Sequence, residues 1–402
     1  MNVVEDPAPG SWRRWAIFVI GSINFMLSMF YRVSTAVISP SLVRDLGFSS
    51  TQLSDLSAVF FYAFAASQIP IGIALDRLGV RLTLAILSVS GISGVLLFAL
   101  GETPNHLIFA RVLLGIGVSG NLMIVLALFA AWFPVDRFGF LSGLVVAVGV
   151  LGTLVGATPL ALMNLWIGWR ASFLVFAVVN SIVVLAFIWV ARDKPPGRAS
   201  FALKSEAFPG GLAGLFGMYS YWAISLSSFV RYGYIAALQG LWATPFLIYG
   251  LGMDEIAASN VLFCLGLGYM VSLPVSGYLS DTVLRSRKQV LLASLSIFSV
   301  LAFSIIWWTQ SVPHWLVVGT FFGLGCASGP GQIMYAHMKE LIPPAMIARA
   351  MTAVNLFTVL GAGIMTHILG LVVGSEPSKL TCPEDFKFMW YVGGISLALA
   401  CV

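Results

Sequence analysis

Apolar runs of 18 or more residues recur along the whole chain, and they constrain its fold more than any other feature. A helix rises about 1.5 Å per residue, so a run of this length can cross most of a hydrocarbon layer about 30 Å thick. Only 9% of the residues are charged and 59% are hydrophobic, whereas soluble domains contain about 25% charged residues. The sequence therefore predicts an all-α integral membrane protein.

The apolar runs predict twelve transmembrane helices. By residue number they are 15–40, 53–75, 82–101, 106–133, 141–165, 170–191, 222–249, 257–279, 289–308, 315–341, 351–373 and 388 onward. The last segment has 15 residues before Val402, or about 22 Å of helix. We interpret it as a truncated twelfth span.

The positions of lysine and arginine predict the orientation. Fourteen of the 21 basic residues fall in loops on one side, four fall on the other side, and three lie within spans. Because cytoplasmic loops retain basic residues, we expect both termini in the cytoplasm. The expected location is the inner membrane of a bacterium.

A basic Pro/Gly stretch at 191–200 indicates a linker between two halves, residues 1–191 and 222–402. Residues 192–221 are the expected cytoplasmic linker and the approach to helix seven. The spacing Gly72–Asp76 after the second helix returns as Gly277–Asp281 after the eighth, with an offset of 205 residues. Likewise, Gly115-Ile116-Gly117 on the fourth helix corresponds to Gly323-Leu324-Gly325 on the tenth. Two parallel six-helix halves are typical of transporters with a substrate site between them.

The segment after the second helix resembles the loop signature of the major facilitator superfamily. This resemblance implies a cytoplasmic gate in which an Asp meets a helix N-terminus and nearby arginines; the alternative is that these charges only anchor the topology. Asp281 and Arg285 would form the counterpart in the second half. The residues that carry the resemblance are Gly72, Asp76, Arg77, Gly79 and Arg81.

The fourth helix contains Arg111 followed by glycines at 115 and 117, which resembles a second superfamily signature. The usual amide of that signature is replaced by Leu114. Arg111 is then either functional or snorkels toward the outer interface near His106. Helix five lacks the Gly-Pro pair of proton-driven drug antiporters, which counts against multidrug efflux.

Arg32 stands alone in a run without other charges from Trp15 to Leu42. No carboxylate lies deep in any predicted span, so the predicted cavity carries positive charge without negative charge. A guanidinium presents a planar fork that binds carboxylate or phosphate in a bidentate way. We therefore expect Arg32 to bind an anion with Tyr31 beside it, and its position resembles the substrate arginine of organophosphate and organic-anion carriers; the alternative is a structural pairing.

Arg231 begins the tripeptide Arg231-Tyr232-Gly233, which resembles the seventh helix of organophosphate antiporters. The repeat, however, places the counterpart of Arg32 at Ala237, about 9 Å farther from the cytoplasm. Arg231 therefore guards the inner mouth, pairs with lipid phosphate or enters the cavity. Other candidate lining residues could instead bond a neighbouring helix: Tyr62, Gln68, Asn121, Gln239, Trp242, Gln332, Tyr335 and Asn355.

The expected function is secondary transport of a small organic anion, such as a sugar phosphate, sugar acid or carboxylate, by alternating access. A proton or an exchanged anion could couple to it, with His337 and His367 as titrating candidates. The alternatives are a carrier of a neutral solute, peptide or drug, and a receptor or assembly factor without flux. The sequence contains no enzyme motif, metal-ligand cluster or disulfide framework, so we do not expect an enzyme or a cofactor. We also expect a monomer in the lipid bilayer, without a nucleic-acid partner.

Overall fold

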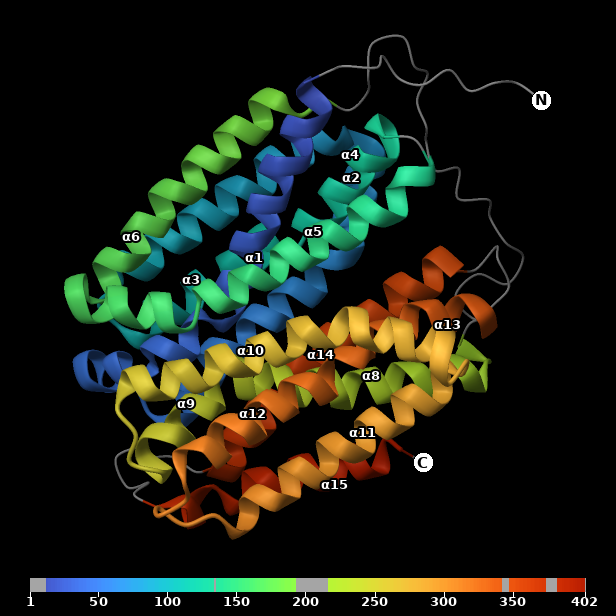
Figure 1. Ribbon diagram of the computed structural model, residues 1–402. Coiled ribbons are helices and arrows are strands. Elements are labelled where there is room, and N and C mark those ends of the chain that lie inside the picture. Colours follow the sequence, from blue (N-terminus) through green and yellow to red (C-terminus); the bar gives the residue numbers. More distant parts are fainter. Residues whose placement is uncertain (1–11, 134, 193–215, 342–346, 374–381, 402) are drawn as a thin grey trace.

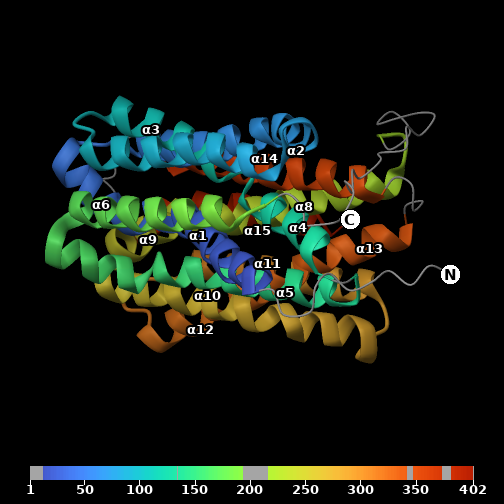
Figure 2. The same cartoon turned by 90° about the horizontal axis from the view of Figure 1, so that it is seen from above.

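The computed structural model describes residues 12–133, 135–192, 216–341, 347–373 and 382–401, and every regular element within these ranges is helical (Figure 1). The helices up to α6 form an N-terminal bundle, and those from α8 form a C-terminal bundle. Figure 1 shows the two as separate groups, coloured blue to green and yellow to red, and Figure 2 shows them from above.

Two glycines turn the chain inside the N-terminal bundle. The elements are α1 (Trp12–Leu46), α2 (Ser50–Leu100), α3 (Pro104–Val118), α4 (Asn121–Trp132), α5 (Val135–Val155) and α6 (Thr158–Val190). Gly79 in α2 and Gly168 in α6 have φ angles of 80° and 78°, which other residues rarely adopt, and each separates two helical segments. These turns lie where the sequence predicts breaks, between 75 and 82 and between 165 and 170.

The helices of the C-terminal bundle are interrupted more often than the apolar pattern predicts. The elements are α8 (Tyr219–Ala237), η1 (Leu238–Trp242), α9 (Ala243–Pro245), η2 (Phe246–Gly250), α10 (Glu255–Tyr278), η3 (Leu279–Val283), α11 (Arg287–Ser304), η4 (Ile305–Trp307), α12 (His314–Ser328), η5 (Gly329–Gln332), α13 (Ile333–Leu341), α14 (Ile347–Val373), η8 (Pro383–Phe386) and α15 (Lys387–Leu399). Two π-helical turns, η1 and η2, lie within the predicted seventh span. The Gly-Pro-Gly sequence of η5 breaks the predicted tenth span.

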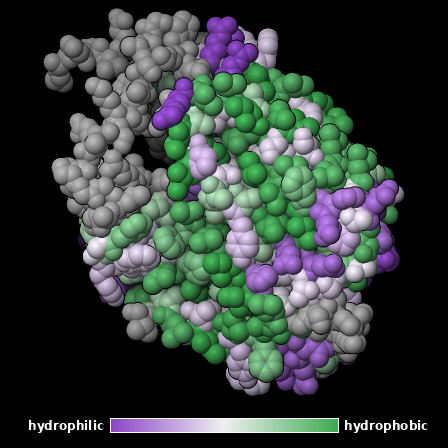
Figure 3. All heavy atoms as spheres, turned by 180° about the vertical axis from the view of Figure 1, so that it is seen from behind, coloured by the Kyte–Doolittle hydropathy of each residue, from purple (hydrophilic) through white to green (hydrophobic). Residues whose placement is uncertain are grey.

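The surface matches a lipid environment. In the described ranges, eight helices are long and apolar enough to cross a membrane; the count of twelve stays a prediction. Figure 3 shows a face covered mostly by hydrophobic residues, with hydrophilic residues at its upper and lower margins and in a band that reaches inward from the right edge. Large exposed tryptophans lie near the helix ends, as is typical of membrane–water interfaces: Trp12, Trp15, Trp166, Trp189, Trp307 and Trp315.

Glycines let the helices of each bundle approach closely, and the contacts repeat between the bundles. A Cβ on Gly115 would collide with the carbonyl oxygen of Phe60, and a Cβ on Gly325 would collide with that of Leu265. Phe60 and Leu265 are separated by the 205-residue offset of the repeat. In its packing, Gly115 therefore corresponds to Gly325. The sequence motif alone, read in order, would pair Gly115 with Gly323.

The two bundles are joined at one end of the molecule. We name the ends by residues that they carry: the Asp55 end, where α2 begins and α14 finishes, and the Gly79 end, where α1 begins. The hydrogen bonds described between the bundles at the Asp55 end are Ser54 Oγ to the Thr366 carbonyl, at 2.8 Å, and Thr158 Oγ1 to Asn260 Oδ1, at 2.7 Å. In Figure 1 the ribbons of the bundles diverge toward the Gly79 end.

Candidate substrate site

Arg32 lies between the bundles, near the middle of α1. Its Nη1 donates a hydrogen bond of 3.0 Å to the hydroxyl of Tyr232 on α8, so the contact joins two residues 200 positions apart. On another side, its Cζ lies 4.6 Å from the centroid of the Phe64 ring on α2. A cation above an aromatic face is attracted by the ring quadrupole. These neighbours hold the guanidinium without neutralising it.

Part of the guanidinium has no partner among the described residues. In the described part of the chain, no carboxylate pairs with Arg32, and its buried Nε has no hydrogen-bond partner. A buried N–H without a partner costs free energy that a bound acceptor would recover.

A second polar group lies close to this arginine. Gln332 Nε2 donates a 3.0 Å hydrogen bond to the hydroxyl of Tyr269 on α10, and Tyr269 lies within electrostatic reach of Arg32, Arg231 and Tyr232. Of these residues, Tyr232 and Tyr269 were not singled out from the sequence. In the sequence, only the position of Tyr232 beside Arg231 indicated that Tyr232 could belong to the site.

Arg231 is held by the backbone of its own bundle. It is 3% exposed, and Nη2 donates a 3.2 Å hydrogen bond to the carbonyl of Gly331 in η5. A Cβ on Gly331 would collide with the guanidinium, so this glycine makes room for it. The arrangement favours a structural role at the break in the tenth span over pairing with lipid phosphate.

Arg111 does not snorkel to the interface, so that expectation is wrong. The residue is fully buried: Nη1 donates to the Tyr31 carbonyl at 2.6 Å and Nε to the Leu56 carbonyl at 3.4 Å. Its Cζ also lies 4.5 Å from the centroid of the Phe60 ring. Arg111 therefore ties α3 to α1 and α2 inside the N-terminal bundle.

Tyr31 does not support Arg32 as expected. Its side chain is fully buried, and its hydroxyl donates to the Phe176 carbonyl on α6 at 3.4 Å. Successive residues on a helix point about 100° apart, so the two neighbours face different partners. Tyr232, from the other bundle, occupies the place expected for Tyr31.

Three of the other candidate lining residues bond neighbouring helices instead. Gln68 donates to the Ser119 carbonyl at 3.2 Å, Asn121 to the Asn24 carbonyl at 3.3 Å and Trp242 to the Thr366 carbonyl at 3.1 Å. All three are buried. The alternative of helix–helix bonding therefore holds for them.

The remaining candidate lining residues lie in different surroundings. Gln239 lines a gap of about 10 Å³, room for about one water molecule, together with Val33 and Val37 of α1, Thr153, Gly156, Ala157 and Leu262. Tyr62 packs against Gly363 of α14, where a Cβ would lie 2.6 Å from its ring. Asn355 is half-buried on α14, and the side chain of Tyr335 lies outside the described residues.

The expected gate loop lies at the Gly79 end. Gly79 makes the turn, while Gly72, Arg77 and Arg81 are exposed. In the second half, Arg285 adopts a left-handed φ of 48°, one residue from the position that the repeat offset assigns to Gly79. The side chains of Asp76 and Asp281 lie outside the described residues, so their gate role stays a prediction.

The two histidine candidates lie in different settings. His337 is half-buried on α13. His367 Nδ1 lies 3.2 Å from Asp55 Oδ1 across the joined end of the bundles. The described residues contain no group of three or more His, Cys, Asp and Glu side chains that could hold a metal ion.

The comparisons with known proteins agree with this architecture. The family model of the Major Facilitator Superfamily matches residues 20–240 and 222–402, which together cover nearly the whole chain. The chain belongs to the major facilitator superfamily. It is accordingly a multi-pass integral membrane transporter of a small molecule, and its relatives within the superfamily include organic-anion carriers.

Members of the superfamily similar to this chain include anion carriers. One is a protein of Agrobacterium vitis provisionally named a tartrate transporter, 24% identical, with 94% of this chain and 86% of that protein covered. A hexuronate transporter of Bacillus subtilis (strain 168) is 24% identical over 72% of this chain and 69% of its own length. Among solved structures, a bacterial homologue of the human lysosomal transporter Spinster, inward-facing and unoccupied, aligns with a TM-score of 0.80 at 16% identity, over 98% of this chain and 96% of that one. This likeness shows the fold.

Proposed function

We propose that this protein transports a small organic anion, with Arg32 as the residue that binds the acid group of the substrate. The observation that carries the proposal is the guanidinium between the two bundles, held by Phe64 and Tyr232 and paired with no described carboxylate. Carboxylate or phosphate oxygens would satisfy its buried Nε and its remaining Nη donors. The names of the tartrate and hexuronate carriers support the same substrate class.

Transport would proceed by alternating access around Arg32. Contacts at the Asp55 end, with bundles diverging at the Gly79 end, describe one of the two states that this mechanism requires. In the orientation that we propose, the Gly79 end and both termini face the cytoplasm of a bacterial cell, so this state is open to the inside. The turn at Gly79 and its neighbouring arginines would close that end in the opposite state.

Counterflow in proteoliposomes tests the substrate class. The panel contains tartrate, glucuronate, a sugar phosphate, inorganic nitrate and a neutral sugar, each tested with wild-type protein and with the Arg32→Lys and Arg32→Ala variants. Charge-assisted hydrogen bonds contribute about 1.5–3 kcal/mol, so Arg32→Ala is expected to lower the apparent affinity for the anion about 10- to 100-fold.

The matched control is Arg44→Ala, because Arg44 is an exposed arginine at the end of the same helix. It should leave counterflow unchanged. Transport of the neutral sugar that survives Arg32→Ala would replace the anion proposal with a neutral-solute carrier. Ligand binding without any flux would favour a receptor.

A further inference from the structure

Asp55 and His367 form a titratable contact between the bundles. Asp55 lies near the start of α2, His367 lies near the end of α14, and Oδ1 and Nδ1 are 3.2 Å apart. Their side chains are 43% and 44% exposed, so the protein encloses neither of them. The contact is unlike the Arg32 site, which has no described ionic partner.

Around the pair, α2 and α14 pack closely against each other, and these two helices must separate when the Asp55 end opens. Ser54, beside Asp55, donates to the carbonyl of Thr366, beside His367, and Trp242 of the seventh span donates to the same carbonyl. A Cβ on Gly370, one turn along α14, would collide with the Ser54 side chain. Opening the Asp55 end therefore breaks the pair together with this contact.

Few other charges reach the pair. On α2, the phenol of Tyr62 lies within electrostatic reach of Asp55. At the end of α1, Arg44 and Asp45 pair with each other at 3.2 Å. On the seventh span, Tyr249 interacts with Arg44 and Glu255 rather than with Asp55. Among the described side chains, His367 is thus the basic partner of Asp55.

The chemistry of the pair gives its strength a pH dependence. Histidine is the side chain that ordinarily gains and loses its charge between pH 5 and 8. A protonated imidazole makes a charge-assisted hydrogen bond to a carboxylate, whereas a neutral one makes an ordinary, weaker bond. A half-exposed ion pair shifts an equilibrium about 1.5- to 5-fold.

We propose that Asp55 and His367 form a proton-operated latch, in which a proton on His367 holds the Asp55 end closed. The latch goes beyond the proposed substrate class, because it requires neither Arg32 nor a bound anion. Falling pH increases the closed population, and rising pH releases it. Opening the Asp55 end weakens the hold of His367 on this proton by the same 1.5- to 5-fold factor, because the bond to Asp55 is lost.

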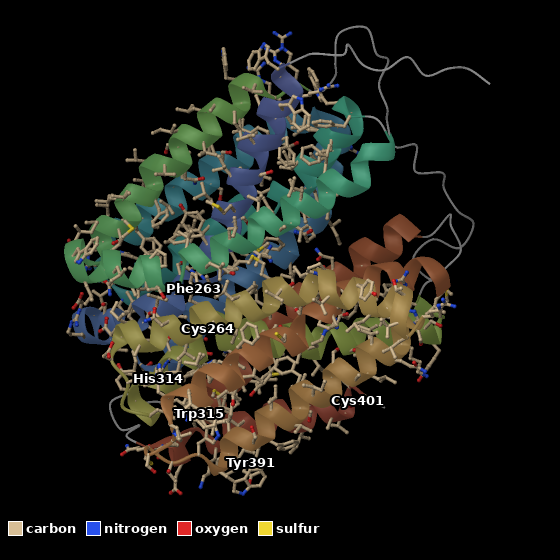
Figure 4. All side chains as sticks on the ribbon, viewed as in Figure 1. Phe263, Cys264, His314, Trp315, Tyr391 and Cys401 are labelled. Carbon is tan, nitrogen blue, oxygen red and sulfur yellow. The ribbon has the colours of Figure 1, made fainter. Side chains whose placement is uncertain are left out.

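Distance measurements between spin labels test the latch. The labels are attached at Glu102 and Ser311, which are exposed at the Asp55 end of the two bundles. The protein is the full chain in lipid nanodiscs, without substrate, between pH 6 and pH 8.5. Four native cysteines, two of them labelled in Figure 4, are first replaced by alanine: Cys264, Cys326, Cys382 and Cys401.

In the parent protein, the ratio of short to long distances should rise about 1.5- to 5-fold from pH 8.5 to pH 6. Asp55→Asn and His367→Gln should each abolish the rise, and the double variant should behave like either single one. The control is His314→Gln, an exposed histidine at the start of α12 (Figure 4), which should keep the full response. A parent response that is absent, or that persists in His367→Gln, would overturn the latch whatever substrate is carried.

Discussion

Arg111 shows how a single arginine can be wholly structural inside a membrane bundle. It is fully buried, bonds the carbonyls of Tyr31 and Leu56, and lies against the ring of Phe60. Arg32, a half-buried residue of the same type, instead bonds a hydroxyl of the opposite bundle. Replacement of each arginine by alanine should therefore affect the stability of the protein differently.

We expect Arg111→Ala to destabilise the protein by about 2–4 kcal/mol, because it removes two hydrogen bonds and leaves a cavity at the junction of three helices. Thermal unfolding in detergent, followed by intrinsic fluorescence, measures the effect as a fall in Tm of several degrees. Arg32→Ala provides the comparison and should change Tm little. Equal Tm values for Arg111→Ala and the wild type would contradict the structural role.

The sequence predicted which arginines lie inside the membrane but not what they contact. The hydrogen-bond partners of Arg32, Arg111 and Arg231 lie 55 to 200 positions away in the sequence. Helical periodicity carries no information about which neighbouring helix a side chain meets. For the same reason Tyr31 was expected beside Arg32 although its hydroxyl lies on α6.

At the level of elements, the close glycine contacts decide how the helices pack. Gly115 lies against the carbonyl of Phe60 and Gly325 against that of Leu265, one contact in each bundle. Without a hydrophobic driving force between helices in lipid, such close approach is a main source of packing energy. The repeat found in the sequence is thus also a repeat of contacts.

We expect Gly115→Ala and Gly325→Ala each to lower the Tm and the yield of monodisperse protein, because the added Cβ would push two helix backbones apart. Gly319→Ala on α12 is the matched control, since a Cβ there has no neighbour within 4 Å. It should leave the Tm unchanged or raise it slightly, because alanine favours helix over glycine by about 1 kcal/mol. Size-exclusion profiles and thermal melts distinguish the three variants, and normal behaviour of Gly115→Ala would refute the packing argument.

The sequence predicted the position of most helices and of the turns at Gly79 and Gly168, since length of apolar runs and glycine between them are local signals. It did not predict the π turns η1 and η2 or the break at η5. The break at η5 depends on a residue far away in the sequence, because the guanidinium of Arg231 bonds the Gly331 carbonyl within it.

For the whole molecule, the contacts at the Asp55 end define a closed side that must open in each transport cycle. Thr158 and Asn260 belong to different bundles, and their side-chain oxygens are 2.7 Å apart. A covalent bridge at this place should trap the state described here.

We expect Thr158→Cys combined with Asn260→Cys, in the background lacking the native cysteines, to lose counterflow when bridged by a short bifunctional thiol reagent. A reducible reagent makes the loss reversible, so activity should return on addition of reductant. Each single cysteine variant serves as a control and should stay active under the same treatment. Undiminished counterflow after complete bridging would exclude opening of the Asp55 end as a step in transport.

The exposed tryptophans have a further consequence for how the two bundles sit in the membrane. At the Gly79 end, Trp12, Trp15 and Trp189 all belong to the N-terminal bundle, whereas at the Asp55 end Trp307 and Trp315 of the C-terminal bundle join Trp166. Interfacial tryptophans anchor a helix at the depth of the lipid headgroups. Exposed tryptophans of the N-terminal bundle thus lie at both membrane interfaces, whereas at the Gly79 end the C-terminal bundle presents the exposed tyrosines Tyr219 and Tyr278 instead, so that both bundles carry aromatic anchors at each interface.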